Sequence, residues 1–428
     1  MSLPEADRLG NFGLTGKRAN GQTVSMQSID KKIFIVLFFS IFATVTGVGI
    51  VVPLLPVYAH NLGAGGFAIG MIFGSFSLAR TFFLPYFGRL SDKKGRKPFI
   101  ITGLFSYALI SLAFIFSDTV EMLILIRLFQ GFASAMIMPV VQAYVGDFTP
   151  PGKEGFVMGL FNMSVFLGLS IGPMMGGLIN DHFNLTSTFV CMGSLSLVAF
   201  FLCLFMLPST KEERVHTDMR KPMAWRQILK DQTIAVLFFF RLAYTACIGI
   251  IWGFLPVLGA TEMSLSSTAI GFLVMEGVMI SGLMHVPMGY LSDRIDRRGM
   301  IAFGGLLVAG AIFSFFWVKG FWGLFNASLI FGLGGGICMP AIMAVAVVKG
   351  NSTDAMGSVM ALLTVAHSLG MLAGSLMAGL MMDVFSLRYA FPFGGILMTG
   401  CVLYLIVSAT NLEGSPAPVD VAQVGKRA

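Results

Sequence analysis

Charge is scarce in this sequence. Asp, Glu, Lys and Arg together make up 11% of the 428 residues, whereas a soluble domain carries about 25%. Apolar residues make up 56%. So few polar side chains are unable to cover a water-soluble globule of this length, which excludes a soluble protein. Lipid must therefore be the solvent for much of the chain.

Cysteine and recognisable catalytic clusters are scarce as well. The five cysteines lie within apolar runs, and neither their spacing nor their odd number fits a metal site or a disulfide framework. The sequence shows no nucleophile–base pair, metal-ligand cluster or phosphate-binding loop. We therefore expect no enzymatic activity, no metal and no cofactor.

The formal net charge of +7 does not indicate a nucleic-acid partner, because the cations lie in short loops between apolar runs. Lys and Arg gather in the two tails and in 93–97, 209–232 and 294–298, whereas none occurs near 60–67, 118–121, 181–187 or 259–268. By the positive-inside rule, we expect a multi-pass protein of the cytoplasmic (inner) membrane with both termini cytoplasmic.

Long apolar runs dominate what is present. A spanning helix needs about 20 apolar residues, and these runs do not alternate with period two, so they predict helices rather than a barrel. The runs lie near 33–59, 67–90, 98–117, 122–147, 155–180, 187–208, 233–258, 268–291, 300–318, 323–348, 356–382 and 388–409. They predict an all-α membrane protein with twelve transmembrane helices.

The two halves of the sequence repeat. Gly88 and Asp92 return as Gly289 and Asp293 at an offset of 201, and Asp181 returns as Asp383 at an offset of 202. A parallel repeat of two pseudo-symmetric six-helix bundles is the layout of a rocking transporter, with its cargo site between the halves. The predicted parts are an N-terminal tail 1–32, a first bundle 33–208, a linker 209–232, a second bundle 233–410 and a C-terminal tail 411–428.

Four motifs carry a family resemblance. Gly88-Arg-Leu-Ser-Asp-Lys-Lys-Gly-Arg-Lys97 resembles the loop signature of the major facilitator superfamily, and Arg127-Leu-Phe-Gln-Gly131 resembles its arginine motif. Gly168 to Gly177 resembles its antiporter motif, and Gly49 to Pro56 the proline signature of twelve-helix drug:proton antiporters. The resemblance covers Lys32 to Asn411. It implies the major facilitator fold and a monomeric antiporter that exports amphiphilic small molecules in exchange for protons by alternating access.

The loop signature implies a conformational latch. We expect Gly88 and Gly95 to form a tight hairpin, with Asp92 just beyond the end of the second helix. The resemblance implies that Asp92 and Arg96 join a cytoplasmic charge network that closes the outward-facing state, and Asp147 is the natural partner of Arg96. Asp293 is the corresponding residue in the second, less complete copy. The alternative is that the loop cations serve only as a topology signal.

The antiporter motif places Gly168, Gly172 and Gly176 on one helix face, where they allow close backbone packing. Pro173 removes a backbone donor and bends the helix, and Gly177 completes the motif. We expect this helix to seal and reopen a cavity at the interface of the halves. Ordinary packing of small residues is the alternative.

Ionisable side chains inside the predicted spans are candidates for proton coupling or substrate binding, because a charge is costly there. Arg127 matches the arginine motif, which the resemblance ties to proton coupling. Glu276 is either a proton carrier or the partner of Arg241 in a structural salt bridge. Arg80 binds an anion, closes a gate or snorkels. His367 titrates near neutral pH, and for it, as for His285, packing or hydrogen bonding is the simpler explanation.

Three intramembrane arginines against one glutamate make the interior net positive. This weakens the case for a cationic drug and favours a neutral or anionic cargo. A transporter of organic anions or anionic lipids that uses these arginines is therefore the alternative function.

Overall fold

The computed structural model describes residues 20–147, 149, 154–208, 230–352 and 356–408, with backbone only for a few of them. Most of the predicted tails and linker lie outside these residues. Twelve described helices are long and apolar enough to cross a membrane by length and composition. The prediction of an all-α protein with twelve spans is thereby confirmed.

The first half contains α1 (Asn20–Val51), α2 (Leu55–Asn61), α3 (Gly66–Lys94), α4 (Arg96–Ala113), the short 3-10 helix η1 (Phe114–Phe116), α5 (Val120–Asp147), α6 (Glu154–His182) and α7 (Leu185–Met206). The second half contains α9 (Gln232–Thr261), α10 (Ser267–Ser292), α11 (Arg297–Ser314), α12 (Gly320–Ser352), α13 (Met356–Val384), the 3-10 helix η3 (Leu387–Tyr389) and α14 (Ala390–Val407).

The first apolar run is not one continuous helix. Helix α1 ends at Val51, and α2 begins at Leu55, with Pro53 in the break and Pro56 in the first turn of α2. Proline has no backbone N–H to donate to the preceding turn, so two prolines at this spacing interrupt the helix. The expected single span over 33–59 is therefore two collinear pieces of one membrane crossing.

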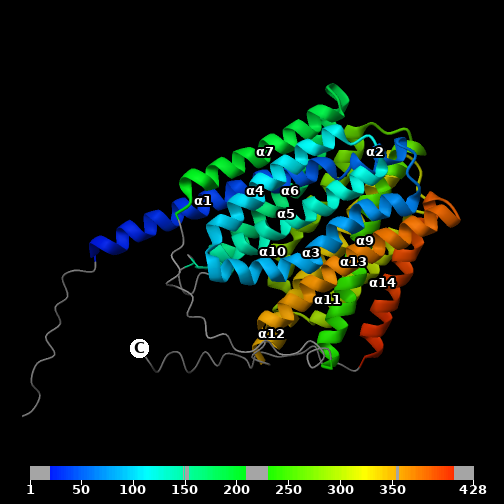
Figure 1. Cartoon of the computed structure of the whole chain (residues 1–428). Coiled ribbons are helices and arrows are strands. Elements are labelled where there is room, and N and C mark those ends of the chain that lie inside the picture. The colour runs from blue at the N-terminus through cyan, green and yellow to red at the C-terminus, as the bar shows by residue number, and fades with distance from the viewer. Residues whose placement is uncertain (1–19, 148, 150–153, 209–229, 353–355, 409–428) are drawn as a thin grey trace, which may run out of the picture.

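The two halves lie side by side and separate toward one end. The ribbons come together near α2 and α9, and they diverge toward the start of α1 and the end of α12 (Figure 1). We call the end that carries Gly95 and Asp296 the basic end, and the end that carries Gly63 and Asn184 the distal end.

The buried apolar side chains follow the same division. One cluster joins the second half to distal parts of the first half, including Ile50, Phe73 and Phe189. The other cluster consists of first-half residues nearer the basic end, such as Leu37 and Tyr144. Close packing of apolar side chains therefore joins the halves at the distal end, whereas the first half has a core of its own toward the basic end.

Close backbone approach joins the halves at the distal end. A Cβ atom at Gly70 of α3 would overlap the carbonyl of Ser375 in α13, and one at Gly271 of α10 would overlap the carbonyl of Pro173 in α6. Only a glycine allows helices to approach this closely. The two contacts are repeats of each other, so the pseudo-symmetry extends to the interface between the halves.

Candidate functional site

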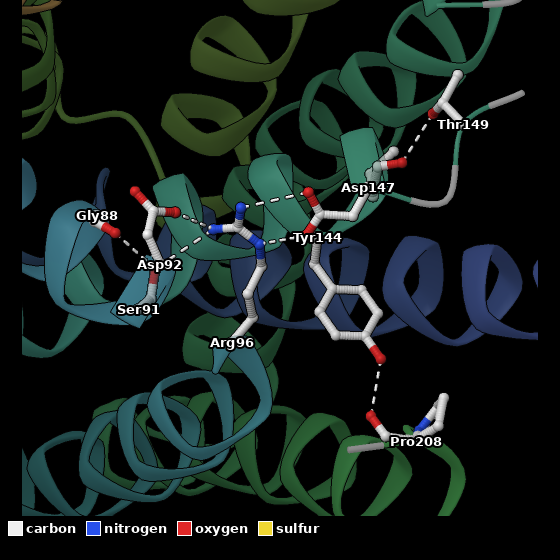
Figure 2. A network of polar contacts seen from close by, with 9 residues as sticks. Gly88, Ser91, Asp92, Arg96, Tyr144, Asp147, Thr149 and Pro208 are labelled. Atoms are coloured by element: carbon white, nitrogen blue, oxygen red, sulfur yellow. Dashed lines mark hydrogen bonds and ion pairs between the residues drawn. The ribbon is translucent and has the colours of Figure 1, made fainter. Parts of the chain in front are cut away.

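The loop signature of the first half forms a charge network at the basic end. Arg96 Nη1 donates to Asp92 Oδ1 (2.8 Å), while Nε and Nη2 donate to the carboxylate of Asp147 (2.5 and 3.3 Å). Figure 2 shows the guanidinium between the two carboxylates. Asp92 comes from α3, Arg96 from the start of α4 and Asp147 from the end of α5. All three belong to the first half, so the ion pairs that Arg96 makes with these two carboxylates lie within one half.

Two expectations about this loop were wrong. Helix α3 continues to Lys94, so Asp92 lies within its last turns instead of beyond its end. Gly88 is helical, and its missing Cβ would meet no atom within 4 Å. The turn depends on Gly95 alone, whose φ of 85° falls in the region that favours glycine. The hydroxyl of Ser91 donates to the carbonyl of Gly88 (2.7 Å) within the continuing helix.

The second copy of the loop has fewer ionic partners. Arg297 donates to Asp293 (3.2 Å) and to the carbonyl of Ser292 (2.9 Å). Val348 stands 201 residues after Asp147, so the second half has no carboxylate at that position. The difference between the copies is therefore the loss of a cross-helix ion pair.

The end of α12 has an ion pair of a different kind. Lys349 donates to Asp231 (2.7 Å), which also caps the N-terminus of α9 by accepting from the amides of Thr233 and Ile234. Partial burial by itself would raise the pKa of Asp231, but these hydrogen bonds and the Lys349 charge lower it below its ordinary value.

Two loop cations have partners that the sequence did not reveal. Lys97 donates to the carbonyl of Leu207 (2.5 Å) just after α7, and Arg298 donates to the carbonyls of Leu405, Ile406 and Ser408 at the end of α14. Both satisfy free helix carbonyls with a cation, as the helix dipole favours. Lys97 and Arg298 are 201 residues apart, and that offset was the one available signal.

Two carboxylates join the halves at the distal end. Asp181 of α6 accepts from the amides of Ser267 (3.1 Å) and Thr268 (2.7 Å), which begin α10. Asp383 of α13 accepts from the amides of Gly66 (2.5 Å) and Phe67 (2.7 Å), which begin α3. Each places a negative charge on the N-terminus of a helix in the other half. We call these two pairs the clasps.

The clasps were missed by sequence reasoning. Asp181 and Asp383 were recognised as repeated positions, but a partner that consists of backbone amides leaves no side-chain pattern to search for. The remaining signal was an acidic residue that recurs at the end of the fifth helix of each half.

The antiporter-motif glycines lie elsewhere than expected. Gly168, Gly172 and Gly176 pack against the backbone of α1 around Phe42, Thr46 and Ile50, within the first half. Of the motif residues, Gly177 and the carbonyl of Pro173 meet α10 of the second half. The four-residue spacing correctly indicated one packed face, but periodicity does not say which neighbouring helix occupies it. The motif helix lies at the interface of the halves as expected, but its three spaced glycines pack against α1 of its own half.

Arg127 is buried within the first half, with 5% of its surface exposed. It donates to the side-chain oxygen of Gln130 (2.7 Å) and to the carbonyl of Ile72 (3.3 Å), and its guanidinium lies 4.3 Å from the ring centroid of Phe76. These partners are neutral. Arg127 is therefore held in place without an ion pair among the described residues.

Glu276 is a buried carboxylate of α10 with 4% of its surface exposed, and neither oxygen has a hydrogen-bond partner among the described residues. The salt bridge with Arg241, one of the two alternatives, is therefore not formed. The hydroxyl of Ser328 on α12 is also buried without such a partner. Two unsatisfied polar groups thus lie on a packed pair of helices in the second half.

Arg241 and His367 lie together in the second half. Arg241 Nη2 is 3.4 Å from His367 Nδ1, and Nη1 lies 2.7 Å from the sulfur of Met339. Arg80 of the first half lies on α3, which packs against α13, the helix of His367. The structure therefore brings Arg241 and His367 together and places Arg80 across the interface on α3, where it shares the ring of Phe76 with Arg127. Glu276 stands apart from these residues.

Twelve spans in two repeated bundles, with polar groups buried between them, define the class as a two-bundle membrane transporter. The sequence profile of the Major Facilitator Superfamily matches residues 37–352. The chain belongs to that superfamily, and its members are transporters and not enzymes.

Relatives of known name cover nearly the whole chain. An uncharacterized MFS-type transporter of Methanocaldococcus jannaschii is 28% identical over 386 residues, or 89% of this chain and 99% of its own length. Multidrug resistance protein 2 of Bacillus subtilis is 26% identical, covering 86% of this chain and 93% of its own length. Quinolone resistance protein NorA of Staphylococcus aureus is 23% identical, covering 88% and 97%.

Solved structures share the fold at lower identity. The nucleoside transporter NupG superposes with a TM-score of 0.76 at 13% identity, over 87% of this chain and 99% of its own. The human organic anion transporter MFSD10 (TETRAN) superposes with a TM-score of 0.61 at 16% identity, over 88% and 99%. These likenesses show the major facilitator fold alone.

Proposed function

We propose that this secondary transporter is a proton-coupled antiporter that exports amphiphilic small molecules by alternating access. It works as a monomer in the cytoplasmic (inner) membrane, with its basic end and both termini in the cytoplasm. Two relatives that cover almost the whole chain are named for drug resistance, at 23 and 26% identity. Their names support export of drug-like amphiphiles without identifying a cargo.

The observation that carries the proposal is the environment of Glu276. An ionised carboxylate buried without a partner is costly, whereas a protonated carboxyl is much less so. Glu276 therefore holds a proton while it is buried as in this conformation, and it releases that proton when the site is hydrated. A group that alternates between the two environments is suited to carry the coupling proton.

The packing of the halves supports alternating access. The halves are joined at the distal end by the clasps and by the glycine contacts, while at the basic end Arg96 pairs with Asp92 and Asp147 of its own half. Transport requires the reverse arrangement as well. In that state the clasps open, and the two basic loops come together.

Flux in proteoliposomes tests the proposal. A quinolone and an aliphatic sulfonate are the probes, and flux is measured with and without an imposed pH gradient. We expect gradient-driven flux in the wild type and a loss of about tenfold or more in Glu276→Gln, which keeps the shape but removes the titratable group. Exchange of probe without a gradient persists in this variant.

Glu121→Gln is the matched control, because Glu121 is exposed at the start of α5. It should retain gradient-driven flux. Flux that is indifferent to the pH gradient in the wild type would overturn the coupling, and unchanged coupling in Glu276→Gln would overturn the role of that residue.

A further inference from the structure

Arg80 is a charged side chain that lacks a counter-charge. It makes no hydrogen bond or ion pair with a described residue, its Nε is buried, and its guanidinium lies 5.6 Å from the ring centroid of Phe76. An arginine inside a membrane span is costly unless it is paired or hydrated. Phe76 offers only a weak cation–π contact in return.

Snorkelling does not explain Arg80. Helix α3 continues beyond the predicted span to Lys94. Residues 81–88 carry no charge, and the next charged residue, Arg89, lies nine residues (89 − 80) after Arg80, which is roughly 14 Å along the axis. That is farther than an arginine side chain reaches, so the position of Arg80 needs another reason.

The packing of α3 against α13 places Arg80 just beyond the sealed part of the interface. Three glycines of α3 contact α13 in turn: Gly66 meets Gly379, Gly70 meets Ser375, and Gly74 meets Leu372. The two helices are antiparallel, so the next positions opposite one another are those around Arg80 and His367. Arg80 thus enters the interface where the close helix contact of the distal end stops.

Arg241 and His367 complete the group from the second half. Arg241 Nη2 lies 3.4 Å from His367 Nδ1, and Arg241 Nε is buried without a hydrogen-bond partner among the described residues. His367 lies on α13 close to the positions that the antiparallel packing places opposite Arg80. Among the described residues, no ion pair brings a carboxylate to any of the three.

We propose that Arg80, Arg241 and His367 form a binding site for the acidic headgroup of an amphiphile, a carboxylate, sulfonate or phosphate held between the halves. Two guanidinium groups with unused N–H donors match the oxygens of such a group. The headgroup also supplies the counter-charge that the cluster lacks. The inference rests on the proposed function, because it assumes that the cargo binds between the halves, and it specifies the charge of that cargo.

Binding to the purified full chain in nanodiscs of zwitterionic lipid tests the site. The probes are three molecules with the same alkyl chain: a sulfonate, a trimethylammonium and an alcohol. We expect the sulfonate to bind at least about tenfold more tightly than the other two, because a charged hydrogen bond stabilises the complex on that scale. Arg80→Gln and Arg241→Gln should each remove most of this preference, and Arg80→Lys should restore part of it.

Arg294→Gln is the matched control, because Arg294 is exposed at the basic end, with its guanidinium 4.1 Å from the ring centroid of Tyr290. It should leave sulfonate binding unchanged, and alcohol binding should be equal in all variants. Equal binding of the three probes by the wild type would overturn the site. So would sulfonate binding that survives Arg80→Gln combined with Arg241→Gln.

A second arm identifies the source of the headgroup. If anionic phospholipid in the nanodisc competes with the sulfonate in the wild type but not in Arg80→Gln, the site takes a lipid headgroup; if it does not compete, the site takes a free amphiphile. Both outcomes support an acidic-headgroup site. Binding and coupling are measured separately, so a flux without proton dependence would overturn the proposed antiport while leaving the sulfonate preference intact.

Discussion

The two halves of the molecule share a backbone arrangement but not a polar chemistry. Gly131 packs against the carbonyl of Phe76, and Gly332, 201 residues later, packs against the carbonyl of Gly277, 201 residues after Phe76. The helix pairs α3–α5 and α10–α12 are therefore built alike. At the next level of detail the halves differ.

Polar residues have exchanged places between these two helix pairs. The first half has Ser75 on α3 and Arg127 on α5, whereas the second half has Glu276 on α10 and Ser328 on α12 at the same offset. Ser75 and Arg127 have hydrogen-bond partners, while the Glu276 carboxylate and the Ser328 hydroxyl have none among the described residues. Duplication thus preserved the packing surfaces, and divergence placed the buried carboxylate in one half and the buried arginine in the other.

The largest effect is expected from breaking the equivalent glycine contacts. Gly70→Val and Gly271→Val each insert a side chain where a carbonyl of the other half lies. Overpacking of this kind destabilises by roughly 1–3 kcal/mol. We expect each variant to lower the population closed at the distal end by about tenfold, measured by distances between spin labels on the 62–65 and 385–386 loops. Because the contacts are repeats, the two effects should be equal within twofold.

Gly310→Val controls for the change of residue type within a helix, because a Cβ at Gly310 meets no atom within 4 Å. It should leave the distance distribution unchanged. A large effect from one interface glycine and none from the other would contradict the pseudo-symmetric interface.

A smaller effect is expected from the clasps. Asp181→Asn and Asp383→Asn keep a hydrogen-bond acceptor at the N-terminus of the partner helix but remove the negative charge. A negative charge at a helix N-terminus stabilises the contact by about 1 kcal/mol. Each substitution should shift the same label distances toward an open distal end by roughly fivefold in population, and the double variant should show the two effects added. If the double variant stays closed like the wild type, the clasps do not control the distal end.

The smallest effect is expected at the basic loops, where the loop of the first half should respond more strongly than the loop of the second. Arg96 is paired with carboxylates on two helices, whereas Arg297 has a single carboxylate partner, and all of these carboxylates are partly exposed. Exposed ion pairs contribute at most about 1 kcal/mol. Arg96→Gln should therefore shift labels across the two basic loops away from the separated arrangement in which these pairs are formed, by a few-fold in population at most, and Arg297→Gln by less. Equal shifts would remove the distinction between the two copies.

The sequence predicted the repeat and the spans because both depend on local composition. Helix boundaries were less accurate where local signals conflict: Ser91 to Lys94 are polar enough to resemble a loop, yet they continue α3. The antiporter-motif face was recognised from its spacing, but its neighbour was not, because several helices surround α6. The clasps were not predicted, since their partners are backbone amides that every residue except proline possesses.

The sequence by itself determined that this chain is a duplicated twelve-span transporter, because apolar length and a constant repeat offset are properties of the chain order. The tertiary structure decided which ionisable groups act on one another. It left Glu276 without Arg241 and placed Arg241 beside His367. It also packed α13, which carries His367, against α3, which carries Arg80, 287 residues earlier (367 − 80). Charges interact through distances in space, and those distances depend on how the two halves pack.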